Sequence, residues 1–253
     1  MRLRKRKRKD PNEMTILEHI EELRIRLLWI VGGVFAGLPL TISHSRQIID
    51  IIIAPLKQAL PTGSKIIFTG VTEAFWVRVE AAFIAAIILT IPFTFYQIWL
   101  FVAPGLKENE KKFAIPFVFA FSFFFVSGVV FAYKVVLPLG FKFLLHYGGK
   151  ELSAMPTIRQ YMYLFLKMIT AFGLVFELPV VTFILARIGL VSGKDLLKKF
   201  DYALLIIFIV AAILTPPDVF TQFLMATPLT LLYVLSIVIA YIFSTKDKKK
   251  QKE

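Results

Sequence analysis

Long apolar stretches separated by short polar segments dominate this chain of 253 residues. Most of these stretches approach the roughly 20 residues that a helix needs to cross a bilayer. The pattern therefore predicts an all-α, polytopic membrane protein with six transmembrane helices. The stretch 202–215 would be only about 21 Å long as a helix, so we expect the last two helices to form a short hairpin. The expected spans are residues 27–42, 74–103, 113–133, 161–186, 202–215 and 219–243.

Two of the connecting segments are long, and we expect them on the outer side of the membrane. They are residues 43–73 and 134–160. Within the first, residues 46–55 are apolar but too short to span, so this piece should lie along the membrane interface. Trp99, near one end of the second span, is typical of an interfacial anchor.

The chain carries a net charge of +13, and most of the surplus lies at its two ends, in residues 2–9 and 246–252. In a protein with a mean hydropathy of +0.72, such runs indicate a cytoplasmic location by the positive-inside rule rather than nucleic-acid binding. An even number of spans puts both termini on that side. We therefore divide the chain into a disordered basic arm (1–13), a six-helix transmembrane domain (14–243) and a basic cytoplasmic tail (244–253).

No pattern in the sequence indicates an enzyme. The chain has no cysteine, and its three histidines are scattered without metal-ligand spacing. The segment Gly189–Lys194 superficially suggests a phosphate-binding loop. Its glycines stand too close together, and Asp195 follows the lysine where such a loop needs Ser or Thr. We interpret it as a turn that ends a helix, and we expect no catalytic residue, cofactor or metal site.

Glu177 is the most unusual residue of the fourth span, because an acid near the middle of a bilayer costs several kcal/mol. The cost falls if the acid faces a bundle interior, meets a partner or takes up a proton. Pro179 should kink the helix beside it. Lys167 lies about 15 Å away along the axis, too far to neutralise it. We favour a polar contact with a partner or substrate over a purely structural acid; for Gln222, in the last span, the two readings are balanced.

A second group of acids flanks the cytoplasmic ends of the first spans. Carboxylates bind guanidinium groups in a directional, bidentate way, so a pocket for a cationic peptide is one reading. The other is that Glu22 merely pairs with Arg26 one helical turn later, and from spacing alone we favour this one. The acids are Glu18, Glu21, Glu22, Glu108 and Glu110.

Several ordered segments carry a resemblance to a known family. They are His19–Leu27, Ala54–Leu56, Tyr96–Leu106 with Glu110, Phe172–Pro179 and Leu214–Gln222. Together they resemble TatC, the multispanning core subunit of the twin-arginine protein translocase, over nearly all of residues 14–243. So many long matches in one order make the resemblance specific. Only the basic arm has no counterpart in the family pattern.

The resemblance implies a concave bundle in the inner membrane that acts as a receptor for twin-arginine signal peptides of folded precursor proteins. The arginine-reading acids of the family fall on Glu22 and Glu110, which reverses the preference from spacing alone. Arg24 and Phe101 lie in the same motifs and are expected to shape that cytoplasmic site. Pro55 matches a structural proline of the outer loop.

The resemblance also implies partners within the membrane. Glu177 corresponds to the acid on the concave side, where a signal peptide or a small subunit docks. Asp218 and Gln222 match the region that contacts single-span subunits similar to TatA and TatB. Further copies of the chain and membrane lipid are the other expected partners, and the proton-motive force the expected energy source. The alternative function is a proton-coupled transporter of small solutes that uses Glu177.

Overall fold

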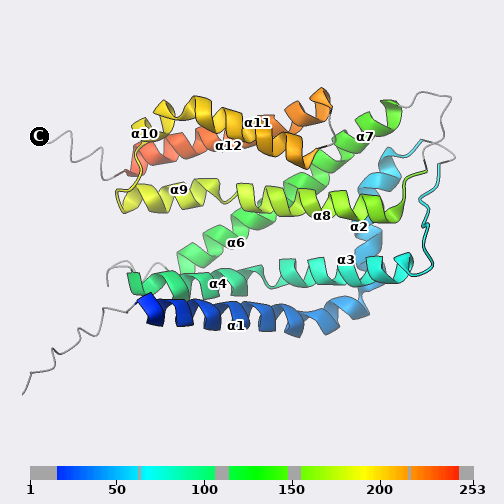
Figure 1. The fold of residues 1–253 in the computed structure, drawn as a ribbon, viewed down its shortest axis with the longest axis horizontal. Helices are drawn as coiled ribbons and strands as arrows, with labels where there is room; N and C mark the ends of the chain where they lie inside the picture. Colours follow the sequence, from blue (N-terminus) through cyan, green and yellow to red (C-terminus); the bar gives the residue numbers. More distant parts are fainter. Residues whose placement is uncertain (1–15, 62–63, 106–113, 148–154, 216–217, 245–253) are drawn as a thin grey trace, which may run out of the picture.

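The structure is a computed structural model that describes residues 16–61, 64–105, 114–147, 155–215 and 218–244 (Figure 1). The described residues are almost entirely helical, and their one isolated β-bridge joins Ile67 to Thr157. The elements are α1 (Ile16–Ser43), α2 (Ser45–Ala59), α3 (Glu73–Leu89), α4 (Ile91–Val102), η1 (Ala103–Gly105), α6 (Ala114–Phe131), η2 (Ala132–Val136), α7 (Leu137–Tyr147), α8 (Ile158–Val175), α9 (Leu178–Arg187), α10 (Gly193–Lys198), α11 (Phe200–Leu214) and α12 (Val219–Phe243).

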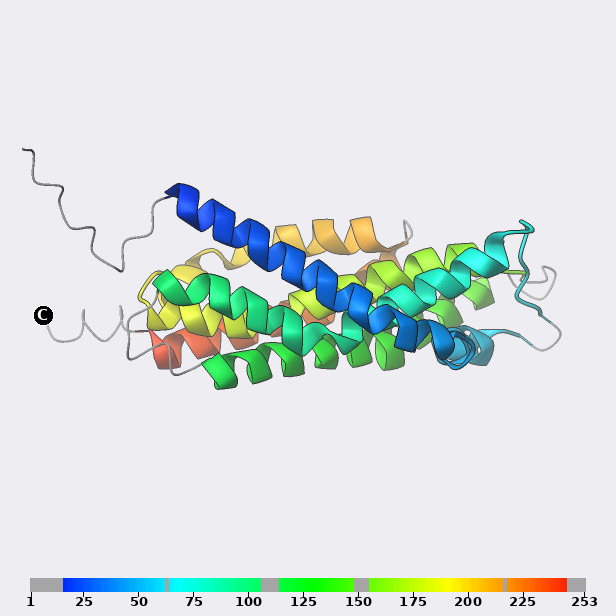
Figure 2. The ribbon, with the colours of Figure 1, turned by 90° about the horizontal axis from the view of Figure 1, so that it is seen from below.

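The long helices run side by side in an elongated bundle, with α6 and α7 crossing it obliquely (Figures 1 and 2). One end of the bundle holds the start of α1, the end of α4, α10 and the end of α12; we call it the terminal end. At the opposite end α2 lies across the bundle beside the starts of α3 and α8, and we call this the α2 end. The α11–α12 hairpin does not reach as far toward the α2 end as α8 does (Figure 1).

Four helical stretches are each long and apolar enough to cross a membrane. The consecutive helices α3 and α4 make a fifth if the pair is one span, and α11 is shorter, with 15 residues. The prediction of an all-α, multi-pass fold with a short penultimate helix is confirmed, whereas the count of six and the side of the termini stay predictions. The long stretches are Leu17–Ser43, Ala114–Leu145, Ile158–Arg187 and Val219–Phe243.

Prolines interrupt two of these spans where the sequence suggested bends. The chain bends by 54° between α3 and α4, just before Pro92. Residues 176–177 separate α8 from α9, and Pro179 occupies the first turn of α9, where its missing N–H leaves no helical bond unmade. The predicted kink at Pro179 is therefore observed as a break that leaves Glu177 between two helices.

The third span is longer than predicted. We expected an outer segment from Lys134 onward, but helix continues through the π-helical turn η2 into α7 and ends at Tyr147. A π-helical turn already displaces the usual hydrogen-bond pattern, so Pro138 can follow it without a break. The Tyr133 hydroxyl donates to the carbonyl of Ile51 at 2.7 Å and fixes this turn against α2.

The predicted interfacial piece is α2, which continues through Pro55 to Ala59. One face of it is buried in the main core, with Leu56 fully enclosed and the Tyr161 hydroxyl of α8 donating to the carbonyl of Ile52. Trp99 is also inside: it is 6% exposed and packs on Phe117, so its prediction as an interfacial anchor was wrong. A second core cluster fills the space between α4, α6 and α9, and consists of Ile91, Phe95, Phe121, Phe125 and Val180.

Glu73, the first residue of α3, ties the two long outer segments together. Its Oε2 accepts hydrogen bonds from the amides of Thr69 (2.8 Å) and Gly70 (3.0 Å) and from the Thr69 hydroxyl (3.2 Å). Its Oε1 accepts from the amide of Arg159 at the start of α8, at 3.0 Å. One buried carboxylate thus joins residues far apart in the sequence, a role that we did not predict.

We expect Glu73→Gln to lower the free energy of unfolding, because the amide group would turn a donor toward backbone donors. Glu80→Gln on the same helix removes an exposed charge and should change little. Chemical unfolding of both variants in detergent measures the difference. Equal stability of the two variants would contradict the proposed tie.

The helices α6 and α8 touch at Gly128. A Cβ at this position would lie 2.4 Å from the carbonyl oxygen of Phe172 and 2.9 Å from the Cβ of Phe176. Small residues allow such close approach between helices in membranes, where packing replaces the hydrophobic effect. Gly128 therefore fixes the distance between the third span and α8, the helix that ends just before Glu177.

Gly128→Ala should destabilise the bundle by about 1–3 kcal/mol, because the backbone of α8 cannot yield to a methyl group. Gly140→Ala, in α7, is the matched control: nothing lies within 4 Å of its Cβ position, and alanine favours the helix. Melting temperatures in one detergent compare the two. A Gly128→Ala variant as stable as Gly140→Ala would show that the helices can move apart freely.

Candidate functional site

The first turns of α1 lie against the end of α4 at the terminal end. The ring of His19 stacks on Phe101, with centroids 4.3 Å apart and planes 15° from parallel. This contact brings the motif that contains Glu22 next to the motif that contains Phe101, as the resemblance implied. Glu110 and Glu108 lie outside the described residues, so a joint pocket of Glu22 and Glu110 stays a prediction.

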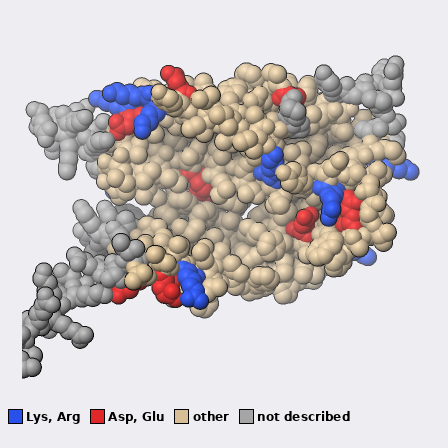
Figure 3. All heavy atoms as spheres, viewed as in Figure 1, with Lys and Arg blue, Asp and Glu red and all other residues tan. Residues whose placement is uncertain are grey.

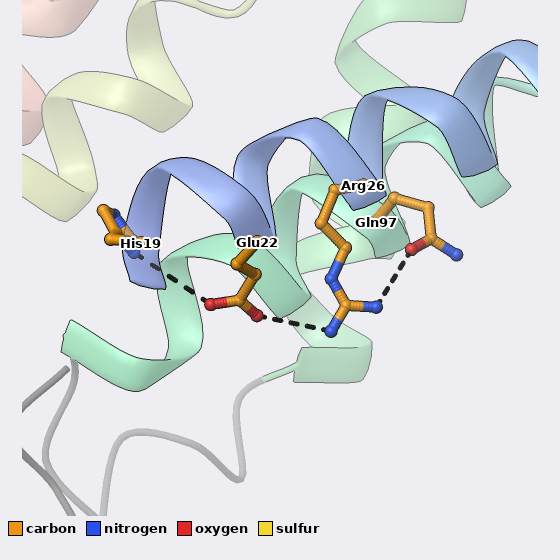
Figure 4. Close-up of polar contacts among 4 residues, drawn as sticks. All are labelled: His19, Glu22, Arg26 and Gln97. Atoms are coloured by element: carbon orange, nitrogen blue, oxygen red, sulfur yellow. Dashed lines mark hydrogen bonds and ion pairs between the residues drawn. The ribbon is translucent and has the colours of Figure 1, made fainter. Parts of the chain in front are cut away.

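Glu22 is held by a chain of polar contacts between α1 and α4 (Figure 4). Its Oε1 lies 3.3 Å from Nη2 of Arg26, and Nη1 of Arg26 donates to Oε1 of Gln97, also at 3.3 Å. Gln97 is buried, and the side chains of Glu22 and Arg26 are only 16% and 26% exposed. Arg26 and the buried amide therefore orient the carboxylate.

The second oxygen of Glu22 has no hydrogen-bond partner among the described residues, although it is buried. Nδ1 of His19 is 4.0 Å from it, and that contact is an ion pair only if the imidazole is protonated (Figure 4). A carboxylate oxygen in a site of low dielectric attracts a charged donor more strongly than one in water. Glu22 thus combines a fixed position with unused capacity to accept a cationic hydrogen bond.

Arg24 does not join this group. Its Nη1 lies 3.4 Å from Glu21 Oε1, and both side chains are largely exposed. A residue two positions after Glu22 points to roughly the opposite side of a helix. The structure instead adds Arg26, Gln97 and His19 to the surroundings of Glu22. The signal for Gln97 was a lone amide in an apolar span.

Glu177 is the other acid with unused hydrogen-bonding capacity. It is 7% exposed, and neither carboxylate oxygen has a partner among the described residues. Its backbone is satisfied, because its amide donates to Leu174 and its carbonyl accepts from Val181. As expected, Lys167 does not reach it: Nζ of Lys167 donates to the carbonyl of Ile213 at the end of α11.

The remaining predicted residues make contacts within the fold. Asp218 caps α12, with Oδ1 accepting from the Thr221 amide at 2.7 Å. Gln222 donates from Nε2 to the carbonyl of Phe208 at 3.2 Å, so its amide links α12 to α11. Pro55 is buried inside α2. The structure does not show Glu177 in contact with Asp218 or Gln222.

The glycine-containing segment is a turn, as interpreted from the sequence. Gly189 has a φ of 80°, the left-handed conformation that ends helices. Ser192 then caps α10, with its hydroxyl and the Asp195 carboxylate each accepting from the other's amide. The segment therefore connects α9 to α10.

Three comparisons relate the chain to known proteins. The profile of the family described as Sec-independent protein translocase protein (TatC) matches residues 18–228. Proteins named Sec-independent protein translocase protein TatC from Desulforapulum autotrophicum and Carboxydothermus hydrogenoformans are each 43% identical, covering 93% and 92% of this chain and 87% and 96% of their own lengths. The Campylobacter jejuni protein of that name is 41% identical, over 93% of this chain and 97% of its own.

The fold agrees with the same group. A crystal structure of a twin-arginine translocase receptor, TatC, superimposes with a TM-score of 0.78 at 34% sequence identity. The alignment covers 88% of this chain and 98% of that one. A second crystal structure of such a receptor, in DDM, gives the same TM-score at 33% identity.

Proposed function

The chain belongs to the TatC family of Sec-independent protein translocase proteins, and on this premise we propose that it binds twin-arginine signal peptides at its terminal end. As a family member with several apolar helices it is a multi-pass membrane protein, in bacteria one of the inner membrane. It is a component of a protein translocase. We propose that it receives precursors as a scaffold, without a catalytic reaction of its own.

The observation that carries this proposal is the arrangement around Glu22. A guanidinium offers two parallel N–H donors to a carboxylate, whereas an ammonium offers a point charge. Arg26 already contacts one oxygen of Glu22, and the second oxygen, which is buried and has no partner among the described residues, has the capacity to accept a donor from a second guanidinium. We propose that Glu110 provides a carboxylate for the other arginine of the signal, and that the stacked rings of Phe101 and His19 form an aromatic wall beside it.

We further propose that Glu177 is the contact point for a single-span partner subunit within the membrane. Its buried carboxyl group has no partner in the described chain, and a polar side chain from outside would remove the cost of that burial. Asp218 and Gln222 position the α11–α12 hairpin beside it, which supports a role in presenting this surface. Additional copies of the chain are proposed as part of the same assembly, with the proton-motive force driving transport.

The alternative, a proton-coupled transporter of small solutes, has weaker support. It rests on Glu177 alone, and the family match covers both Glu22 and Glu177. A solute carrier would also have to move solute when reconstituted without partner subunits. A lack of solute movement down a pH gradient in such vesicles separates the two functions.

Glu22→Gln should weaken binding of a labelled twin-arginine peptide by about tenfold, because a neutral amide forms a weaker bond with a guanidinium. Glu21→Gln is the matched control, since Glu21 is the neighbouring acid and pairs only with Arg24 in the described chain. Fluorescence anisotropy with the full chain in detergent measures both affinities. Glu110→Ala should likewise weaken binding more than Glu108→Ala.

The same assay contains a test of the recognition chemistry. A peptide with two lysines in place of the arginines should bind clearly more weakly to the parent chain. Equal affinity for the two peptides would contradict arginine recognition, whatever the effect of the variants.

Glu177→Leu should separate partner binding from stability. We expect the variant to lose co-purification of single-span subunits while the free energy of unfolding stays equal or rises by about 1–3 kcal/mol, because an unpartnered buried polar group is removed. Thr182→Val, at a buried position one turn further along α9, should retain the subunits. A destabilised Glu177→Leu variant that keeps its subunits would assign Glu177 a structural role instead.

A further inference from the structure

A cavity of about 660 Å³ opens at the α2 end, between α2, the start of α3 and residues 60–61 and 64–68. Its volume falls in the range of small-molecule sites. Apolar side chains form part of the wall, among them Ile49, Ile53 and Val77. The charged residues that line the cavity are all cations: Lys57, Lys65 and Arg78.

The cations of this cavity are largely uncompensated. Within the described residues, Lys65 and Arg78 make no ion pair, and Lys57 shares an exposed pair with Asp50 at 3.3 Å. Cations in a span or at its edge are costly unless a negative group meets them. The cavity lies at the end opposite the basic termini, where the positive-inside rule disfavours Lys and Arg. A ligand with negative charge would offset the energetic cost of these uncompensated cations.

Exposed aromatic side chains place the cavity at headgroup depth. Phe68, which lines it, is 64% exposed, and Phe75 and Trp76 are 63% and 53% exposed on the first turn of α3. Among aromatic residues, tryptophan and tyrosine gather at the boundary between acyl chains and headgroups, so the exposed Trp76 is the side chain that supports headgroup depth. The transverse helix α2 runs across the same end of the bundle (Figure 1). Figure 3 shows that most atoms on the face of the bundle drawn there belong to uncharged residues, with a few acidic and basic side chains between its ends.

We propose that this cavity binds an anionic phospholipid of the outer leaflet. The negatively charged phosphate lies between Lys65 and Arg78, with Lys57 at the rim, and the upper part of one acyl chain packs on Ile49, Ile53 and Val77. The combination of positive charge and apolar wall distinguishes a lipid from a free anion, which needs no apolar wall. A lipid is also favoured over an acidic protein segment, because the cavity adjoins the aromatic side chains at the membrane boundary.

The bound lipid would hold α2 and residues 64–68 at the bilayer surface. These elements contact α3, and Glu73 links the start of α3 to the start of α8. The lipid therefore stabilises the outer end of the bundle independently of the peptide site at the terminal end. The proposal goes beyond the signal-peptide function and does not depend on it.

The test uses the full chain in nanodiscs with Trp76 as the only tryptophan, obtained with Trp29→Phe and Trp99→Phe. Brominated phosphatidylglycerol and brominated phosphatidylcholine, at equal fractions, report which lipid lies next to Trp76 by quenching. We expect stronger quenching by brominated phosphatidylglycerol than by brominated phosphatidylcholine. Each cation that contacts the lipid should favour phosphatidylglycerol by about fivefold. Lys65→Gln with Arg78→Gln should reduce the preference to near unity, and Lys65→Gln alone should reduce it partly.

Arg46→Gln with Arg159→Gln is the matched control. Both arginines are exposed at the same end and do not line the cavity. The two substitutions remove the same amount of charge as Lys65→Gln with Arg78→Gln. This variant should keep the preference. Equal quenching by the two lipids in the parent, or equal loss in both double variants, would overturn the proposal. If inorganic phosphate abolished the preference for phosphatidylglycerol, the cavity would be a site for small anions. If an acidic peptide abolished it, the cavity would be a site for a protein segment. Either result would overturn the lipid proposal.

Discussion

A polar group inside a bilayer has no water to bond, and this constraint explains most of the side-chain contacts in the bundle. Lys167 donates to the carbonyl of Ile213 at the end of α11, and Gln222 of α12 donates to the carbonyl of Phe208, also in α11. Tyr161 and Tyr133 both donate to carbonyls of α2. In each case a side chain from one helix satisfies the backbone of another, so the bonds also fix which helices are neighbours.

Against this background, two acids stand out because the described chain leaves them incompletely satisfied. One oxygen of Glu22 and both oxygens of Glu177 are buried without a hydrogen-bond partner. Glu73 shows what a fully satisfied carboxylate looks like in the same protein, with hydrogen bonds to both oxygens. The difference separates an acid that serves the fold from the two acids for which we propose partners in other molecules. Burial alone would not have separated them, since Glu73 and Glu177 are 5% and 7% exposed.

The sequence predicted the helices because apolar length and proline position act locally. The family resemblance implied that Glu22 and Phe101 share a site; the His19–Phe101 stack brings their two motifs into contact, and the shared site itself stays a prediction. The sequence did not predict the role of Glu73 or the burial of Trp99, because both depend on residues far away in the chain: Arg159 for the first and Phe117 for the second. The helical continuation at Lys134 was missed because a π-helical turn has no clear sequence signal.

The contact between Glu22 and Arg26 also bears on how a receptor can distinguish arginine from lysine. If the carboxylate could rotate freely, it would accept hydrogen bonds from cations in many directions, including from an ammonium. Arg26 and Gln97 restrict that rotation, so the remaining oxygen accepts from a limited direction. A planar fork of donors can meet such an oxygen while bonding a second acceptor nearby, whereas a single ammonium cannot align with both in the same way. Pairing within α1 and recognition of a peptide are therefore compatible, and the first prepares the second.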